Sequence, residues 1–559
     1  MRSILARIGA HPWPVLAIAI AIAAVVILAA GNGLSFSGDE LYYFGRQADV
    51  ALPPVHYGSF SLEYLLAPHN GHLQPAGKLI YEAMFVIFGA DYTPFRVLEL
   101  LLVMVSIGLF FELARTRLGA PVALLLAILL CFLGAAWEVL LWPFDLHTIG
   151  ALAAGLGALL VLERGGRRAD PIACLLLCVS IAFVELGVAI AAAVAVSILI
   201  RGDRRRRLWI VAVPGVLYIA WYLWARRFEL TPVGLENAAD VIGSWFDSLR
   251  AVGSSLTGTL ATGDGAPVPV VGLSAFGAVL AGGAIALFAL RLRRGALPPT
   301  FWPLLTALLV YWTFIGLAER SADSSRYVFA GAVLVLLVAA DLLRDRRPGP
   351  GAIAILALIV ALALPGNIAK LEDGGDYLAK DAELTRGEFA MLEVAGPHAK
   401  PGYVAAYDGV ARQVGASPYL VMDAAIYLDA VRRIGSLADS LDVVRGRELI
   451  LRQTYDVVLA RTLDLKLEPV AAPDQRRLAC DTPAGAPGVS PVPAQGVFVQ
   501  ALDADVELRI SRFVPNLPIF TLGTVAAGDW VRLDLPGADS APDPWKLFFD
   551  APIRACVER

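Results

Sequence analysis

Long apolar runs separated by short polar segments occupy the first two thirds of this chain. A run of about twenty apolar residues crosses the hydrocarbon core of a bilayer as a helix. The pattern predicts about eleven membrane spans, at residues 12–31, 95–114, 120–138, 146–162, 170–184, 185–200, 208–225, 269–290, 302–318, 327–344 and 350–365. A further apolar stretch, residues 75–89, is short and carries Lys78 and Glu82. We interpret it as an amphipathic helix on the outer membrane surface.

Clusters of arginine predict the orientation of these spans, because basic loops stay on the cytoplasmic side. The clusters precede the first span and follow the second, fourth, sixth, eighth and tenth spans, at Arg2, Arg7, Arg115, Arg117, Arg164, Arg167, Arg168, Arg204, Arg205, Arg206, Arg207, Arg291, Arg293, Arg294, Arg344, Arg346 and Arg347. Every second loop is therefore basic, which places the N-terminus in the cytoplasm. The eleventh span then places residues 366–559 outside.

The pattern changes after residue 365, where the long apolar runs end. Residues 366–480 contain helical-looking segments, and residues 481–495 form a linker rich in Pro and Gly. Residues 496–559 contain short alternating stretches bounded by turn residues, which predict strands. We therefore predict an extracytoplasmic α/β region that ends in a small β-sandwich.

Four residues give this outer region its candidate chemistry. Outside the cell, Cys480 and Cys556 are expected to form a disulfide. The sandwich is either a carbohydrate-binding module or an inert β-domain. In the first case Trp530 and Trp545 would be its stacking residues.

Composition supports a polytopic all-α membrane protein. The chain is 57% hydrophobic and 17% charged, a balance that soluble globular domains rarely reach. Its net charge of −4 provides no basic field, so we expect no nucleic-acid partner. The five cysteines lack the paired spacing of a structural zinc site.

The first outer loop, residues 32–94, is rich in reactive side chains. Asp39 and Glu40 follow the first span, where a carboxylate pair suits general-base work or metal binding. The alternative is that the pair caps a helix at the interface. Further on, His69 and His72 flank Asn70-Gly71. The two histidines either share a helical face and a metal, or belong to a turn.

Other ionisable residues interrupt the apolar segments further along the chain. They are Asp145 and His147 between the third and fourth spans, Glu185 between the fifth and sixth, and Arg320 and Arg326 between the ninth and tenth. Such groups are costly in a membrane, so each is a candidate for function; the alternative is snorkelling to the interface. An arginine here is a natural partner for phosphate.

Taken in order, these features resemble the GT-C membrane glycosyltransferases, in particular the protein O-mannosyltransferase and lipid A aminoarabinose transferase branch. The likeness rests on the acidic pair in Gly38-Asp39-Glu40 and on a surface helix from Pro75-Ala76-Gly77-Lys78 to Phe88-Gly89. It also rests on a following span with Arg96 at its start and LARTRLG at its end, and on the late SSRY segment. The HNGHL segment departs from the pattern of that branch.

The resemblance implies that the enzyme transfers a sugar from a polyprenyl-phosphate donor on the outer face of the cytoplasmic membrane. The acceptor would be a cell-envelope glycan, lipid or protein. Asp39 would deprotonate the acceptor hydroxyl, and Lys78, Arg96 or Arg326 would neutralise the donor phosphate. Glu40 would orient the acceptor or hold a divalent cation, for which His69 and His72 are further candidates. His69, His72, Asp145, His147 and Glu185 would contact the substrates.

Two other functions fit the same sequence. A transporter or flippase of lipid-linked sugars would also have many spans, although such proteins tend to carry internal repeats, and none is obvious here. A membrane scaffold whose outer domain binds envelope glycans is the other alternative. The gathering of acids, histidines and arginines on one predicted face favours the enzyme.

Overall fold

The chain forms a helical unit and a mixed unit in the computed structural model. The structure describes residues 11–48, 50, 52–57, 59–202, 204–228, 235–258, 275–295, 297–318, 320, 323–344, 346, 348–404, 422–480, 487–536 and 542–559. Arg2, Arg7, Arg347 and the start of the span expected at 269–290 lie outside these residues.

The two units do not divide at the predicted residue 365. Unit 1 comprises Met1–Leu34 and Arg46–Ala379, and unit 2 comprises Ser35–Gly45 and Lys380–Arg559. The difference arises because helix α18, Pro350–Ala395, continues well beyond the last apolar run. The acidic segment after the first span also groups with unit 2 rather than with the spans.

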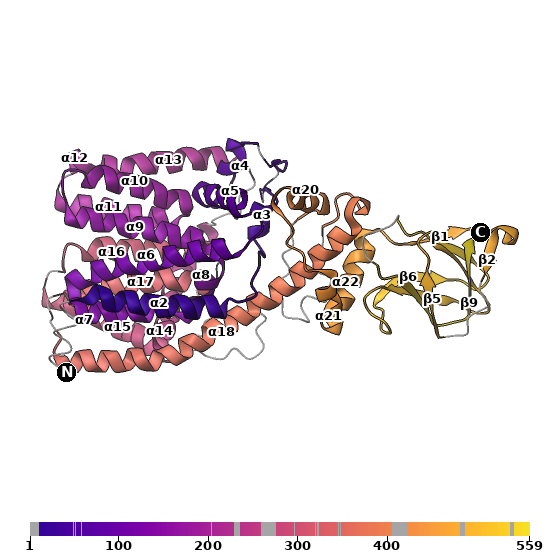
Figure 1. The fold of residues 1–559 in the computed structure, drawn as a ribbon. Helices are drawn as coiled ribbons and strands as arrows, with labels where there is room; N and C mark the ends of the chain where they lie inside the picture. Colours follow the sequence, from indigo (N-terminus) through magenta and orange to yellow (C-terminus); the bar gives the residue numbers. More distant parts are fainter. Residues whose placement is uncertain are drawn as a thin grey trace. The chain divides into compact units, whose positions relative to one another are not determined.

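Most of the long helices of unit 1 run along a common direction (Figure 1). Its longer helices are α2 (Pro12–Ala30), α5 (Pro75–Phe88), α6 (Thr93–Leu118), α7 (Ala120–Cys131), α9 (Leu146–Arg164), α10 (Ala169–Phe183), α11 (Leu186–Arg201), α13 (Trp209–Ala225), α14 (Val241–Thr257), α15 (Ala275–Arg294), α16 (Phe301–Leu317), α17 (Ser325–Leu342) and the start of α18. Its short elements are α4 (Leu62–Leu66), α8 (Trp137–Leu141), α12 (Arg204–Arg207), η1 (Gly134–Ala136), η2 (Pro143–Asp145) and η3 (Leu235–Ala239).

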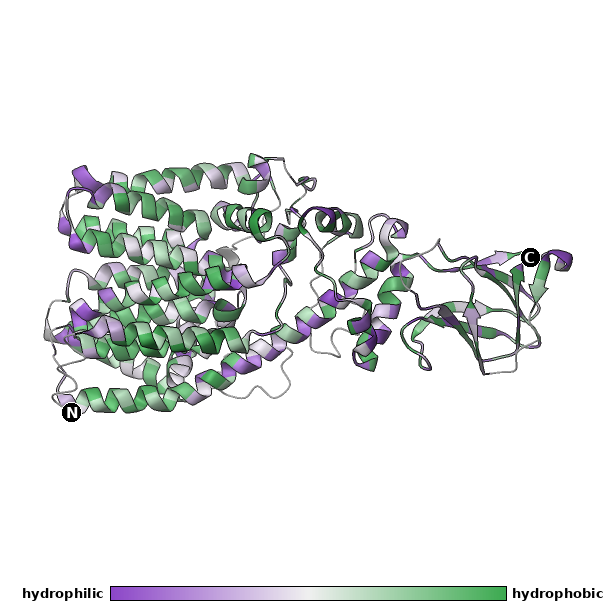
Figure 2. Cartoon of the chain, in the orientation of Figure 1, coloured by the Kyte–Doolittle hydropathy of each residue, from purple (hydrophilic) through white to green (hydrophobic). Residues whose placement is uncertain are grey.

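The helices agree with a multi-pass membrane protein. Among the described residues, 6 helices are long and apolar enough to cross a membrane, and the bent pair α7 and α8 would make a seventh span. Shorter apolar helices occur at Ala169–Phe183, Leu186–Arg201, Trp209–Ala225 and Phe301–Leu317. Each predicted span therefore coincides with a helix or a bent pair of helices. Figure 2 shows these helices hydrophobic over most of their length, with hydrophilic residues gathered towards their ends.

Two helices differ from their sequence-based descriptions. The span predicted at 120–138 breaks after Cys131, and α8 follows at an angle of 43°. Helix α14 was not predicted, because its Ser, Asp and Arg residues interrupt the apolar run. The stretch at 75–89 forms the predicted helix α5.

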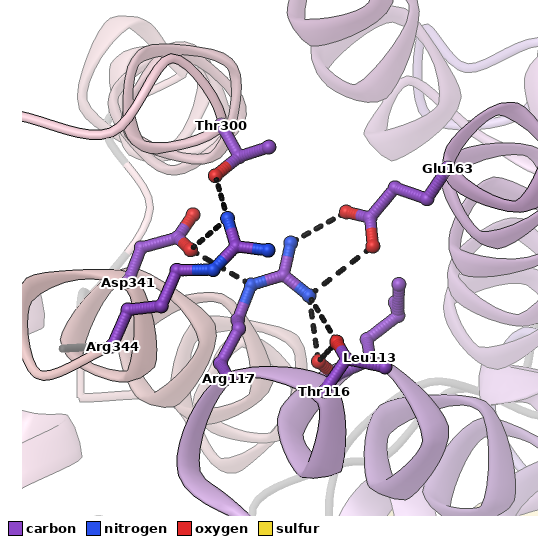
Figure 3. Close-up of polar contacts among 7 residues, drawn as sticks. All are labelled: Leu113, Thr116, Arg117, Glu163, Thr300, Asp341 and Arg344. Carbon is purple, nitrogen blue, oxygen red and sulfur yellow. Dashed lines mark hydrogen bonds and ion pairs between the residues drawn. The ribbon is translucent and has the colours of Figure 1, made fainter. Parts of the chain in front are cut away.

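An ion-pair network joins three helices at the end of unit 1 that we predict to be cytoplasmic (Figure 3). Arg117 of α6 donates through Nε to Asp341 of α17 at 2.9 Å and through Nη2 to Glu163 of α9 at 2.5 Å. The side chains of Arg117 and Asp341 are 1% and 0% exposed. Arg344 contacts Asp341 at 3.7 Å and donates to Thr300 at 3.0 Å. The ends of these helices are thus held together by charge.

Unit 2 joins short helices to a β-sandwich. Its helical elements are α3 (Glu40–Phe44), the end of α18, η4 (Gly396–His398), α20 (Ala424–Ile434), α21 (Leu441–Gly446), α22 (Leu449–Thr462) and η5 (Gln475–Arg477). Tyr427 of α20 stacks on Phe389 of α18 with ring centroids 4.2 Å apart and donates to Glu393 at 2.7 Å. A carboxylate on α22, Asp456, accepts from the backbone amides of Arg512 and Phe513 at 2.9 Å each, which ties the helices to the sandwich.

The sandwich consists of two antiparallel sheets. Its strands are β1 (Leu467–Val470), β2 (Leu478–Cys480), β3 (Gly488–Val492), β4 (Val497–Ala501), β5 (Val506–Ser511), β6 (Phe520–Val525), β7 (Trp530–Leu533), β8 (Trp545–Phe549) and β9 (Ile553–Glu558). One sheet has the order β1-β7-β4-β9-β2, and the other has the order β3-β8-β5-β6. Cys480 of β2 lies opposite Cys556 of β9, and the two form a disulfide.

Three expectations about this region need correction. The strands begin at Leu467, before the predicted start at 496, and β3 lies within the stretch expected to be a linker. Trp530 and Trp545 are only 7% and 3% exposed. Both indoles belong to the core, because their strands turn these side chains inward. They therefore do not form an exposed surface on which a sugar could stack.

Candidate functional site

Polar residues gather at one end of the unit 1 helices, opposite the Arg117 network. Helices α9, α11 and α17 all begin at this end, with His147, Glu185 and Arg326 at or next to their first turns. Helix α10 ends here at Phe183. The partial positive charge of helix N-termini favours anions, so this end of the unit suits a negatively charged ligand.

Arg326 is held by a carboxylate that the sequence analysis did not single out. Its Nη2 donates to Oε1 of Glu138 at 2.8 Å, and its Nε donates to the same atom at 3.3 Å. The other oxygen, Oε2, accepts from the backbone amide of Arg326 at 3.1 Å and from the hydroxyl of Ser325. Arg326 also lies over the ring of Trp142, at 5.4 Å. The guanidinium is thus fixed in direction, and Nη1 makes no hydrogen bond within the described residues.

His69 and His72 are two ends of a tight turn. Their backbones pair through His69 N to His72 O at 3.1 Å and His72 N to His69 O at 2.8 Å. Asn70 and Gly71 between them have φ of 49° and 81°, the pattern of a type I′ turn that Asn-Gly favours. The turn interpretation is therefore correct and the shared helical face is wrong. The ring of His72 instead contacts the carboxylate of Glu185 through Nδ1.

His147 lies against helix α5 because that helix has a glycine at the contact. A Cβ on Gly77 would come within 1.7 Å of Cε1 of His147. The other face of the imidazole meets Phe144 edge-on, with centroids 5.2 Å apart. Both His147 and its near neighbour Asp145 are buried. Close packing therefore positions this histidine.

Electrostatic contacts show which predicted residues lie near one another. Tyr311 lies within range of the charges of Asp145, Glu185 and Arg326. His147 lies within range of His69, His72 and Lys78. The fold therefore gathers the candidate substrate-binding residues of the later spans and the HNGHL segment into one polar region.

Lys78 and Arg96 have backbone partners. Nζ of Lys78 is buried and donates to the carbonyls of Tyr64 at 2.9 Å and Ala67 at 2.7 Å. Arg96 donates to the carbonyl of Gly31 and, at 3.2 Å, to that of Ile27, and so caps the end of α2. Each would have to leave a carbonyl to neutralise a phosphate, so Arg326 is better placed for that role.

Asp39 and Glu40 lie in unit 2. Glu40 is fully buried, and its Oε2 accepts from the amide of Ser37, three residues earlier in the chain, at 3.2 Å. Asp39 is half-buried at the N-cap position of the same helix. The start of α3 has no side-chain cap hydrogen bond, so the capping interpretation gains no support, and the catalytic assignments of Asp39 and Glu40 stay predictions.

The divalent-cation possibility gains no support from geometry. Within the described residues, no group of three or more His, Cys, Asp or Glu side chains is placed to hold a metal ion.

The residues that sequence reasoning missed are Glu138 and its partner Ser325. Glu138 is the last residue of the span predicted at 120–138, and its side chain was given no role. The sequence did contain a signal for the pair of Glu138 and Arg326. A carboxylate at the end of an apolar span and an arginine in the SSRY segment are both costly in a membrane unless they have a partner of opposite charge.

Comparisons with known proteins show distant structural likeness. No family model and no curated protein matches the chain. The chain is similar to the crystal structure of ArnT from Cupriavidus metallidurans bound to undecaprenyl phosphate, at 13% identity and a TM-score of 0.44, over 75% of this chain and 85% of that one. It is also similar to the apo oligosaccharyltransferase of Archaeoglobus fulgidus, at 13% identity and a TM-score of 0.43, over 82% of this chain and 69% of that one.

A second structure of that oligosaccharyltransferase, tethered with an acceptor peptide, has 13% identity and a TM-score of 0.39, over 81% of this chain and 68% of that one. At such low identity and TM-score the likeness says nothing about the donor, acceptor or catalytic residues of this chain.

Proposed function

We propose that this chain is a membrane glycosyltransferase that moves a sugar from a polyprenyl-phosphate-linked donor to a cell-envelope acceptor. The observation that carries the proposal is Arg326, fixed by Glu138 at the first turn of α17 with Nη1 available. A guanidinium in a rigid position is the preferred partner of phosphate oxygens. A helical unit of apolar spans provides the surroundings that a polyprenyl chain requires.

The reaction would take place at the polar end of unit 1. Arg326 and the N-termini of α9, α11 and α17 would stabilise the negative charge that develops on the departing phosphate. This charge increases as the bond between sugar and phosphate breaks, so the stabilisation acts mainly on the transition state. The predicted orientation places this end outside the cytoplasmic membrane, together with unit 2.

A transporter or flippase of lipid-linked sugars is the second candidate. The observation that favours it is the bend between α7 and α8, because transporters often build their sites on broken helices. Glu138 lies on α8, next to the break. Transport would require the phosphate to bind but would leave the sugar attached to it.

The test of the proposal measures binding and transfer separately. Binding of radiolabelled undecaprenyl phosphate to the purified protein would be compared for wild type, Arg326→Ala and Arg201→Ala, an exposed arginine at the other end of α11. Loss of a charge-assisted contact of roughly 1.5–3 kcal/mol should weaken binding about 10- to 100-fold in Arg326→Ala, with no change in Arg201→Ala.

Transfer would be tested on envelope glycans from cells with and without the protein, by mass analysis. A sugar modification that depends on the protein supports the enzyme. Binding without any such modification favours the transporter. A wild-type protein that does not bind undecaprenyl phosphate contradicts the proposed function.

A further inference from the structure

His72 and Glu185 form a histidine–carboxylate pair at the polar end of unit 1. Nδ1 of His72 contacts Oε1 of Glu185, 113 residues further along the chain. The side chains are 32% and 19% exposed, so the pair is partly shielded from solvent.

The backbone on the histidine side is held in place by a turn and by apolar packing. The pairing of His69 with His72 closes the Asn70-Gly71 turn. The next residue, Leu73, is buried in a cluster with Ile181 of α10 and Trp221 of α13. His72 is therefore fixed at both ends of its short segment.

The backbone on the carboxylate side is equally constrained. Glu185 is the N-cap residue of α11, in the two-residue connection that follows α10. A Cβ on Gly187 would come within 2.4 Å of the backbone of Ser180 and Ile181, so only glycine permits this close reversal. The carboxylate thus has a defined position relative to the imidazole.

The contact leaves the second ring nitrogen available. Within the described residues, Nε2 of His72 has no hydrogen-bond partner, because Glu185 is the one side chain that bonds to the ring. Burial opposes the charged imidazolium, but the Glu185 carboxylate and its hydrogen bond outweigh burial and raise the pKa of His72. The other charged or titratable groups within electrostatic range of the ring are Arg320, Arg326 and His147.

We propose that His72 is the general base of the transfer reaction and that Glu185 is its positioning residue. This inference rests on the proposed function, and it replaces Asp39 in the role that the sequence analysis gave it. A carboxylate on one nitrogen fixes the tautomer, so that the other nitrogen accepts a proton. A base with a pKa near the working pH is also the most effective one.

The proposed step balances without any further reactant. The acceptor hydroxyl forms a bond from its oxygen to the anomeric carbon of the donor sugar. The bond between that carbon and the donor phosphate breaks, and its electron pair leaves with the polyprenyl phosphate. The hydroxyl proton moves to Nε2 of His72, and Glu185 stabilises the imidazolium that results. His72 then releases the proton to water.

The experiment compares four variants of the full-length protein in detergent or proteoliposomes. His72→Gln removes the base, Glu185→Gln removes the positioning charge, Asp39→Asn tests the earlier assignment, and His398→Gln is an exposed control in unit 2. Each is assayed for binding of radiolabelled undecaprenyl phosphate and for transfer from radiolabelled undecaprenyl-phosphate hexoses and pentoses across a pH series.

The expected result is a roughly 10²- to 10⁴-fold loss of turnover in His72→Gln, with undecaprenyl phosphate affinity retained. The base must be neutral to act, so the rate of the wild type should fall at low pH as His72 takes up a proton. Glu185 raises the pKa of His72, so Glu185→Gln should move this acid limb to lower pH and reduce the maximum rate. His398→Gln should match the wild type.

A second measurement tests the effect of Glu185 on the protonation of His72 without an activity assay. Diethyl pyrocarbonate modifies neutral imidazole, and mass spectrometry reports the rate at His72 as a function of pH. The midpoint should lie at lower pH in Glu185→Gln than in the wild type. An unchanged midpoint would show that Glu185 does not act on His72 and would overturn the pair.

The outcomes separate this inference from the function on which it rests. Unimpaired transfer by His72→Gln, particularly beside an inactive Asp39→Asn, overturns the role of His72 and leaves the glycosyltransferase intact. A wild-type protein that neither binds undecaprenyl phosphate nor transfers any of the sugars overturns the proposed function, and the catalytic role of His72 with it.

Discussion

At the scale of single residues, the fold determines which of several plausible cations can meet a phosphate. Lys78, Arg96 and Arg326 were equivalent candidates in the sequence, because each carries a positive charge near an apolar segment. In the structure, Lys78 and Arg96 donate hydrogen bonds to backbone carbonyls. Arg326 donates to the carboxylate of Glu138, which fixes the direction of its guanidinium. The hydrogen-bond partners of a cation thus separate structural from available charge in a way that residue type alone does not.

Glu138 should act on the donor through Arg326 alone. Glu138→Gln keeps the volume of the side chain but removes the charge that fixes the guanidinium, so we expect weaker binding of undecaprenyl phosphate. In an Arg326→Ala background the same change should add nothing further, because residues that act through one contact are not additive. A double-mutant cycle on the dissociation constant measures this coupling.

Independent effects of the two substitutions would contradict a positioning role for Glu138. Ser106→Ala, whose hydroxyl donates to Leu102 within α6 at 2.9 Å, serves as a control for a lost polar group elsewhere among the spans. It should leave the affinity unchanged.

At the scale of helices and strands, the length of an apolar run predicted the helices well, whereas local polarity did not predict breaks or additional helices. Each predicted span coincides with a helix or bent pair, because a long run of apolar residues has few ways to bury itself other than in a helix among lipids or other helices. The break after Cys131 and helix α14 depend on packing against other helices, which no local pattern reports. The same holds for Trp530, whose burial depends on the partner sheet.

The candidate site was predictable in its members but not in its pairings. Asp145, His147, Glu185 and Arg326 stood out because ionisable groups are rare in apolar segments. Which of them touch one another depends on contacts between residues more than a hundred positions apart, such as His72 with Glu185. A single sequence carries no local trace of such contacts.

Arg117 should be a principal source of stability in the helical unit. Arg117→Met removes the nearer ionic partner of buried Asp341, at 2.9 Å, and leaves it Arg344 at 3.7 Å. Breaking a buried ion pair typically costs about 3–5 kcal/mol. We therefore expect a clear fall in the melting temperature of the purified protein, followed by tryptophan fluorescence or nanoscale calorimetry in detergent. Arg164→Ala, which removes a 61% exposed partner of Glu112, should have little effect.

The double variant Arg117→Met with Asp341→Leu tests whether the loss comes from the uncompensated charge. Replacing both partners with apolar side chains should restore much of the stability. A double variant as unstable as Arg117→Met would show instead that packing, not charge, holds these helix ends.

At the scale of the whole molecule, the pattern of basic loops makes a definite prediction about the two sides of the membrane. We expect Gly119 on the cytoplasmic side and Gly89 and Asp373 outside. Single cysteines at these positions, in a background without the native free thiols Cys131, Cys174 and Cys178, would be labelled in intact cells with an impermeant maleimide. Labelling of Gly119→Cys, or protection of Asp373→Cys, would reverse the orientation.

The strand order of the sandwich has a consequence for how the chain acquires its structure. Among the strands of the described residues, β5 and β6 are the one pair of sequence neighbours that hydrogen-bond to each other; β1 pairs with β7, β2 with β9 and β3 with β8. The first four strands are therefore synthesised well before their partners. Joining such distant segments lowers the entropy of the chain before most of the stabilising sheet contacts can form. Assembly of this sandwich should be slow and should begin at the β5–β6 hairpin, leaving the earlier strands in need of protection from aggregation while they wait.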